Sequence, residues 1–224
     1  MSFRIHRQGL PPVAIFVVVM ALASWAWPPL ALPGVILSLW CIWFFRDPDR
    51  HTPAGAGLII APADGRVLPI VKAPPPEELE MGATPLTRIS IFMNVFNVHV
   101  NRIPADGKVT AVHYRPGKFF NASFDKASIH NERLSARMTT TAGHDIAFVQ
   151  IAGLVARRIR STLAAGDAVT AGTRYGIIRF GSRVDVYLPD GLTPMVREGE
   201  ITVAGETVLA SQDAVSATSP EKGD

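Results

Sequence analysis

Residues 10–45 read LPPVAIFVVVMALASWAWPPLALPGVILSLWCIWFF, and the next five residues, 46–50, read RDPDR. Residues 8–45 contain no Asp, Glu, Lys or Arg, although charged residues make up 18% of the whole chain. A Pro-Pro pair at positions 28 and 29 divides the segment into two apolar stretches. Each stretch is slightly shorter than the roughly 20 residues of a spanning helix. We therefore expect a tight helical hairpin over residues 1–50, which either spans a membrane or dips into it.

Basic residues flank this hairpin at both ends. Arg4 and Arg7 precede the first stretch, and Arg46 and Arg50 follow the second. If the hairpin forms, all four lie on one side of the membrane, and basic flanks are typical of the cytoplasmic side. Amphipathic rings that favour a membrane interface lie near the ends of the stretches, at Trp25, Trp27, Trp40 and Trp43. We expect the cell (inner) membrane, with the remaining chain on the cytoplasmic side.

A cleaved signal peptide is the alternative interpretation of the first stretch. It predicts a small-residue cleavage site followed by polar sequence. The small residues at 21–24 are instead followed by Trp25 and a second apolar stretch. The pattern therefore favours a retained hairpin.

Composition also limits the classes of partner and cofactor. The net charge of +3 suits an anionic membrane or a nucleic acid. The chain lacks zinc-finger spacing and an interleaved basic and aromatic pattern, so we expect no nucleic-acid partner. The lone Cys41 excludes an intrachain disulfide and a cysteine-based zinc site. His113, His130 and His144 lack metal-ligand spacing, so we expect no metal site.

From His51 onward, apolar residues alternate or form short runs between Gly and Pro, a pattern typical of strands. The expected strands are residues 57–60, 65–70, 88–100, 107–114, 145–151, 168–170, 176–179 and 184–188. A short helical turn is expected over 75–81 and a loop over 119–131. Residues 51–210 therefore predict a mainly β domain, with two packed sheets or a barrel-sandwich arrangement. The polar composition of residues 211–224 predicts a disordered tail.

Gly181 and Ser182 lie between two of the expected strands. Glycine tolerates strained backbone geometry, and a serine after it can direct its hydroxyl at the preceding carbonyl. Attack there would give an ester through an N-to-O acyl shift. Removal of the serine α-proton would then eliminate the upstream chain and leave dehydroalanine, which hydrolyses to a pyruvoyl group and ammonia. Taken alone, Gly-Ser is also a common turn dipeptide.

His99 belongs to a polar row. In an extended chain, Asn97, His99 and Asn101 point to one face, opposite Val98 and Val100. The apolar phase shifts near residues 95–96, which predicts a bulge or bend. His99 is a candidate general base near neutral pH, and the alternative is an ordinary hydrogen-bonded strand histidine.

Asp64 precedes Gly65 in a predicted tight turn. It is either a simple turn residue or a carboxylate that orients His99 and stabilises its imidazolium. Several basic residues could contact a lipid phosphate or form ordinary solvated surface, namely Lys126, Arg133, Arg157, Arg158 and Arg160.

Taken together, residues 180–183 (FGSR), 97–102 (NVHVNR) and 62–65 (PADG) resemble the short, membrane-associated form of phosphatidylserine decarboxylase. Residues 152–159 and 131–133 are also similar to that family, and the likeness extends over about residues 45–189.

The resemblance implies a self-cleaving enzyme. Ser182 would become the pyruvoyl N-terminus of an α chain, residues 182–224, which stays associated with a β chain, residues 1–181. Asp64 and His99 match the positions implied to assist cleavage. The pyruvoyl cofactor would form a Schiff base with the amine of phosphatidylserine and accept electrons as CO₂ leaves, which yields phosphatidylethanolamine.

The sequence departs from the family at one position. Longer members carry a second histidine three residues after the first, and Arg102 stands there in this chain. His99 could therefore serve both cleavage and decarboxylation. Asn101 and Arg102 are candidates to bind the substrate's phosphate or carboxylate, and a homo-oligomer remains open.

Two other functions are consistent with parts of this pattern. A membrane-anchored β-sandwich adaptor would explain the hairpin and the turns, but not the combination of Asp64, His99 and Ser182. A pyruvoyl decarboxylase of a soluble amino acid would explain the three residues, but not the hairpin.

Overall fold

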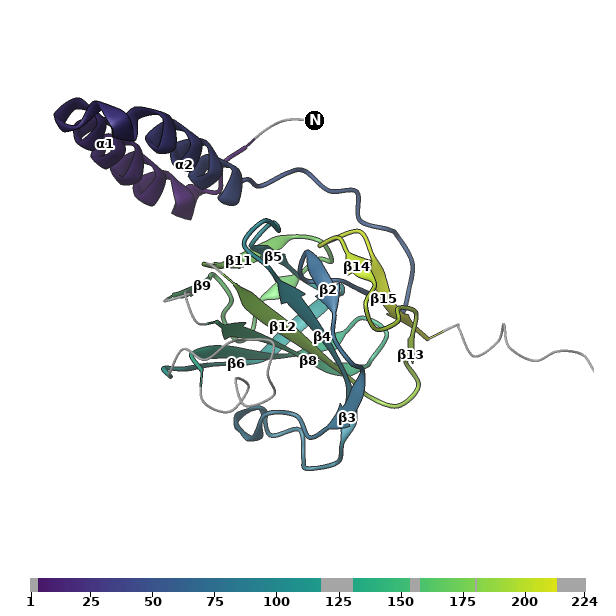
Figure 1. The fold of residues 1–224 in the computed structure, drawn as a ribbon. Helices are drawn as coiled ribbons and strands as arrows, with labels where there is room; N and C mark the ends of the chain where they lie inside the picture. Colours follow the sequence, from purple (N-terminus) through teal and green to yellow (C-terminus); the bar gives the residue numbers. More distant parts are fainter. Residues whose placement is uncertain (1–3, 118–130, 154–157, 180, 213–224) are drawn as a thin grey trace, which may run out of the picture.

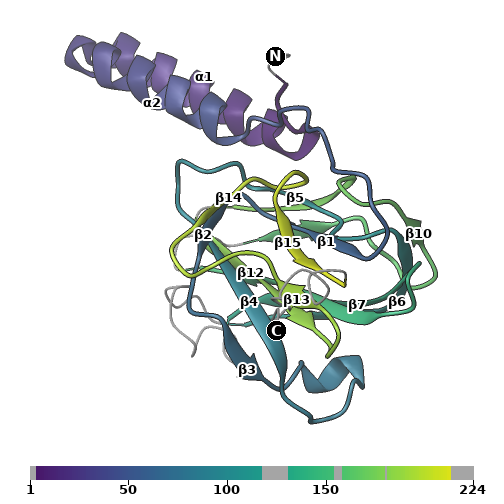
Figure 2. The same ribbon diagram turned by 90° about the vertical axis from the view of Figure 1, so that its right-hand side faces the viewer.

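The computed structural model describes residues 4–117, 131–153, 158–179 and 181–212. Its N-terminal part is formed by η1 (Arg7–Gly9), α1 (Leu10–Ala26), η2 (Pro28–Leu30) and α2 (Ala31–Phe44). The two long helices lie side by side, outside the β domain (Figures 1 and 2). The expected helical hairpin with its Pro-Pro turn is confirmed. The segment Arg7–Ala26 is long and apolar enough to cross a membrane, whereas Pro28–Phe44 is shorter.

The two ends of the hairpin are held together at its base. The His6 N–H donates to the Phe45 carbonyl at 2.9 Å, and the Asp47 N–H donates to the Arg4 carbonyl at 2.7 Å. Gly9 permits this approach, since a Cβ at that position would lie 2.5 Å from Cγ of Phe45. Both ends of the hairpin therefore emerge on the same side, as the flanking arginines suggested.

The rest of the described chain is mainly β, as expected. Its elements are β1 (Leu58–Ile60), β2 (Gly65–Val67), β3 (Val71–Ala73), η3 (Glu77–Leu79), β4 (Leu86–Met93), β5 (Val100–Arg102), β6 (Gly107–Arg115), β7 (Arg133–Thr140), β8 (Asp145–Ala152), β9 (Ile159–Ser161), β10 (Ala168–Val169), β11 (Arg174–Ile178), β12 (Ser182–Leu188), β13 (Thr193–Pro194), β14 (Ile201–Thr202) and β15 (Val208–Ser211). The expected loop at 119–130 and the tail from 213 lie outside the described residues.

The described strands form one large antiparallel sheet and two small ones. The large sheet has the order β10-β6-β7-β8-β12-β4-β2-β14, with β3 also paired to β4. The small sheets have the orders β1-β15-β13 and β5-β11-β9. Strand β12 is central, since it is hydrogen-bonded to β8 on one side and to β4 on the other.

The predicted strand 88–100 was wrong in its second half. Strand β4 ends at Met93, and the amide oxygen of Asn94 accepts from the Phe96 N–H at 2.8 Å while Asn97 bonds back to the Asn94 N–H at 2.8 Å. Asparagine side chains that bond to nearby backbone favour such turns. Of the predicted bulge or bend near residues 95–96, the structure has a bend: a turn that carries the chain from β4 in the large sheet to β5 in a small one.

Two apolar clusters organise the fold. The main core lies within the β domain and includes Ile91, Phe148 and Val186. A second cluster joins the base of the hairpin to the domain. It contains Val13, Cys41, Phe44, Phe45, Val98, Val100 and Ile177. This second cluster brings the hairpin against the strand pair β5 and β11.

Candidate active site

Gly181 and Ser182 lie at the start of the central strand. Gly181 has φ +56°, in the left-handed region that favours glycine, and Ser182 is the first residue of β12. Ser182 is fully buried between Met93 of β4 and Ala152 of β8. Its hydroxyl lies 3.9 Å from Sδ of Met93, a weak acceptor. The hydroxyl is thus buried without a strong partner among the described residues.

His99 is also fully buried, immediately before β5. Its Nδ1 lies 3.0 Å from the carbonyl oxygen of Asn97, so Nδ1 carries the proton and Nε2 has the free lone pair. Nε2 has no hydrogen-bond partner among the residues that the structure describes. The ring packs on Phe44 at the end of α2, with 4.2 Å between ring centroids. Burial lowers the pKa of His99 to about 4; the Asn97 carbonyl opposes the shift, and the charge of Arg46 adds to it.

Asn101 connects the histidine segment to the serine. Nε2 of Gln150 donates to its amide oxygen at 2.7 Å, and its own Nδ2 lies 3.7 Å from Sδ of Met93. The same sulfur lies against the hydroxyl of Ser182. Nδ2 of Asn101 also lies 3.4 Å from the carbonyl oxygen of Pro62. Met93 therefore brings Asn101 and Ser182 to one buried point.

Asp64 has partners other than His99. Its carboxylate accepts two bonds from Nη2 of Arg50, at 2.9 and 3.1 Å, and one from the Ala204 N–H at 2.7 Å. Burial raises the pKa of Asp64, while Arg50 and the Ala204 N–H oppose that shift. The expected orientation of His99 by Asp64 is not what the structure has, because the Asn97 carbonyl occupies Nδ1.

Arg102 is occupied by the backbone. Its Nη1 donates to the carbonyl of Gly172 and its Nη2 to that of Pro48, both at 2.8 Å, and Asp47 lies 3.6 Å away. The side chain is buried, so these bonds attach the segment after the hairpin to the domain. Among the described residues, no hydrogen bond joins Arg102 to the hydroxyl of Ser182.

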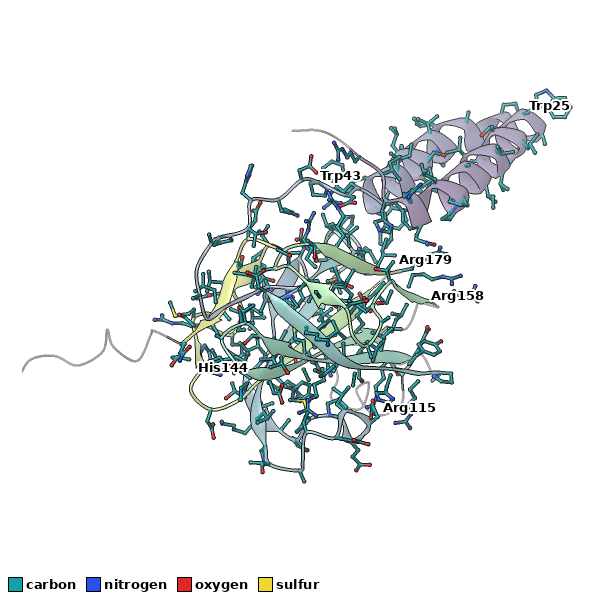
Figure 3. The ribbon with its side chains drawn as sticks, turned by 180° about the vertical axis from the view of Figure 1, so that it is seen from behind. Trp25, Trp43, Arg115, His144, Arg158 and Arg179 are labelled. Atoms are coloured by element: carbon teal, nitrogen blue, oxygen red, sulfur yellow. The ribbon has the colours of Figure 1, made fainter. Side chains whose placement is uncertain are left out.

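The remaining candidates are dispersed. Arg133 pairs with Glu78 at 2.7 Å, and His144 is near Gln212 at 3.3 Å. Figure 3 shows His144 far from the hairpin and from Arg179, which precedes the Gly-Ser segment. Lys126, His130 and Arg157 lie outside the described residues. In the part of the chain that the structure describes, no three His, Cys, Asp or Glu side chains gather in a metal-binding group.

Sequence reasoning missed three contributors to this region: Phe44, Met93 and Gln150. Gln150 could have been noticed, because it is a polar residue within the apolar run of β8. Phe44 and Met93 carry no signal of their own, since apolar residues in a helix and a strand are ordinary core residues. Their importance follows from their positions against His99 and Ser182.

The fold and the site define a hairpin-anchored β domain whose central strand begins with a buried serine after a left-handed glycine. This arrangement fits the class of enzymes that make their own prosthetic group from the chain. The sequence profile described as "Phosphatidylserine decarboxylase" matches residues 37–210. The chain belongs to the phosphatidylserine decarboxylase family.

Curated relatives are similar in sequence to this protein along nearly the whole chain. The chain is 56% identical to the phosphatidylserine decarboxylase proenzyme of Paramagnetospirillum magneticum, over 95% of this chain and 88% of the relative. It is 55% identical to that of Rickettsia bellii, over 92% and 89%, respectively. For the proenzyme of Cereibacter sphaeroides the identity is 54%, over 95% and 91%.

Proposed function

We propose that this chain cuts itself between Gly181 and Ser182 and uses the pyruvoyl group formed from Ser182 to decarboxylate phosphatidylserine to phosphatidylethanolamine. One observation carries the proposal: a left-handed glycine directly precedes a buried serine whose hydroxyl has, among the described residues, only a thioether as a hydrogen-bond acceptor. The family and the word proenzyme in the relatives' names support both the reaction and the maturation.

In the cleavage, Ser182 Oγ attacks the carbonyl carbon of Gly181, and the peptide C–N bond breaks as the ester forms. A base then removes the α-proton of Ser182. The Cβ–Oγ bond breaks, and the upstream chain leaves with a carboxylate on Gly181. Water hydrolyses the enamine that remains and releases ammonia. Gly181, Ser182, a base and water are sufficient for these steps, and no external oxidant or reductant is needed.

His99 is the base that we propose for this site. Its Nε2 lone pair has no partner within the described part of the chain, and its pKa of about 4 keeps the ring neutral at pH 7. A neutral imidazole can accept a proton at once, whereas an imidazolium cannot. Asp64 would act at a distance from His99, by holding residues 61–65 against Arg50 and Ala204.

The residues around Ser182 suit a small carbonyl group. A Cβ built on Gly181 would meet no described atom within 4 Å, so there is open space beside the scissile bond. When present, the pyruvoyl group supplies the electron sink for decarboxylation. Asn101 and Ser182 both contact the sulfur of Met93, and we propose that Asn101 helps to orient the bound substrate.

The architecture also suggests how the two chains and the membrane are arranged. Strand β12 would belong to the α chain, yet both of its neighbours, β4 and β8, would belong to the β chain. Its hydrogen bonds would hold the two chains together after cleavage. We propose that the hairpin lies in the inner membrane and the domain in the cytoplasm, with lipid substrate reaching the domain at the base of the hairpin.

Mass spectrometry of the purified protein tests this proposal. We expect the masses of two chains that result from cleavage after Gly181, with a pyruvoyl group on the smaller one. We also expect activity on phosphatidylserine but not on free amino acids. Ser182→Ala should leave one inactive chain. The matched control is Ser90→Ala, which removes another buried hydroxyl of the same sheet and should be cut normally.

Each alternative function has its own outcome. An uncut wild-type chain would favour the adaptor. A cut chain that decarboxylates a free amino acid, and not the lipid, would favour the other class of pyruvoyl enzyme.

A further inference from the structure

Three arginines gather on the side of the domain that faces the hairpin. Arg160 is paired with Ile177 across β9 and β11, and Ile177 belongs to the apolar cluster with Phe44. Cross-strand partners lie on the same face of a sheet, so Arg160 shares the hairpin face with Ile177. Arg158 precedes Ile159 and Arg179 follows Ile178, and these two isoleucines are also partners.

Figure 3 shows Arg158 and Arg179 side by side below the hairpin. Nη2 of Arg179 donates to the carbonyl oxygen of Gln8, just before α1, at 3.2 Å. Arg179 also lies three residues before Ser182, which limits their separation to about 10 Å along an extended chain. The cluster is thus between the membrane-facing hairpin and the cleavage site.

No carboxylate of the described residues is paired with these three positive charges. Within the described residues, Arg158, Arg160 and Arg179 have no carboxylate at ion-pair distance, and Nε of Arg179 is buried without a partner. Glu132 is nearby, but its Oε1 accepts from the Ile159 N–H at 3.1 Å and from the Tyr114 hydroxyl at 3.0 Å. Burial and the charges of Arg160 and Arg158 lower the pKa of Arg179. Adjacent like charges destabilise a sheet unless an anion joins them.

We propose that Arg158, Arg160 and Arg179 form the binding site for the phosphodiester of the phospholipid substrate. Arginine is suited to this task, because its fork of N–H donors binds two phosphate oxygens at once. A phosphate held there, at the base of the hairpin, leaves the serine part of the headgroup free to extend toward Ser182. This site rests on the proposed function and names the group that the enzyme recognises besides the serine.

The test is the double variant Arg158→Gln/Arg160→Gln, which leaves Arg179 and the cleavage segment intact. Phosphatidylserine is presented in micelles of a neutral detergent, so surface charge plays little part. We expect normal self-cleavage, kcat within about twofold of wild type, and KM raised about tenfold, as for the loss of about 1.4 kcal/mol of binding. Arg115→Gln removes an exposed arginine far from the hairpin (Figure 3) and should leave KM unchanged.

A second measurement separates the substrate phosphate from general attraction to an anionic surface. Wild type and the double variant are compared for binding to vesicles of phosphatidylglycerol, which is anionic but has no serine. An unchanged KM in micelles would overturn the proposal, and a simultaneous loss of vesicle binding would assign the cluster to the membrane surface. An equal KM increase for Arg115→Gln would also overturn it. Absence of self-cleavage in wild type would instead overturn the proposed function.

Discussion

The hairpin and the β domain differ in the solvent exposure of their apolar side chains. In the hairpin, Trp25 is 86% exposed and Leu32 is 70% exposed. In the domain, the large apolar residues of the central strand, Val184, Val186 and Leu188, are fully buried. Apolar surface that is left outside a fold is stable only against another apolar phase, and a lipid bilayer provides one. The domain therefore buries the apolar side chains of its central strand, whereas the hairpin leaves apolar surface exposed, which is consistent with membrane association.

The two regions meet at the candidate site. Phe44 ends the hairpin and packs on the ring of His99, and Phe45 lies in the same cluster as Val98 and Val100. The last residue of the apolar helix α2 is therefore in contact with a residue that we propose for the chemistry. The comparison teaches that the hairpin also covers one side of the candidate site, through the contact of Phe44 with His99. The following predictions test this arrangement in order of expected effect.

The largest effect is expected for His99→Ala. Loss of a general base commonly lowers a rate by about 10²–10⁴-fold, so the precursor should persist. The measurement is a chase of precursor made by cell-free translation, followed on a denaturing gel. His113→Ala, at an exposed histidine of β6, is the control and should be cut normally. Normal cutting of the His99 variant, with an unchanged thermal melt, would place the base elsewhere.

Phe44→Leu tests the contact between hairpin and domain. Wild-type His99, with a pKa of about 4, stays neutral between about pH 5 and 8, so its cleavage rate should be level there. With the ring of Phe44 gone, water can reach the imidazole, and its pKa should rise toward 6.5. Protonation would then remove the base as the pH falls, with a loss of up to about tenfold near pH 5.5.

The control for this experiment is Phe16→Leu, at a partly buried residue that packs against the same cluster but has no described contact to His99. Its pH profile should match wild type. A level profile in the Phe44 variant as well would mean that the hairpin does not control the protonation of His99.

Arg102→Met tests how the domain holds the segment after the hairpin. The change removes the described donor to the Gly172 carbonyl and leaves the Pro48 carbonyl with only the longer bond from Nη2 of Arg174, at 3.5 Å. It should lower the free energy of unfolding by about 1–3 kcal/mol. Urea denaturation in neutral detergent measures the loss. We expect KM for phosphatidylserine to stay the same. A raised KM with unchanged stability would instead support the substrate-binding role expected from the sequence.

The smallest effect on the domain is expected for Trp25→Ala, at the far tip of the hairpin (Figure 3). The domain's free energy of unfolding should change by less than about 0.5 kcal/mol, because Trp25 is remote from its core. Flotation with vesicles should show weaker membrane association. The matched control is Ile201→Ala, an exposed apolar residue of the domain, which should not affect flotation. An equal loss of flotation in both variants would contradict a specific role of the hairpin tip in membrane association.

Much of the fold could be predicted because its signals are local. Proline and glycine mark the turns, alternation marks β6, and a short apolar run marks β8. Strand β7 was missed even though Leu134, Ala136 and Met138 alternate with polar residues. Small and charged residues weaken that alternation, and only pairing with β6 and β8 makes the strand evident.

The site was harder to predict, because it depends on contacts between distant segments. Ser182, His99 and Asn101 were selected from their motifs, and Asn101 reaches Ser182 only through Met93. Asp64 was expected beside His99, but the nearer Asn97 carbonyl bonds to the ring and Arg50 neutralises the carboxylate. No local pattern could reveal those competing partners.

The sequence by itself determined that a long uncharged apolar segment precedes a β domain, and that a Gly-Ser pair lies between two strands. Composition and alternation suffice for these features, because solvation acts on each segment separately. Only the tertiary structure decided that Ser182 begins the central strand, that Phe44 covers His99, and that three arginines gather below the hairpin. Those features depend on which segments pack together, and packing is a property of the whole chain.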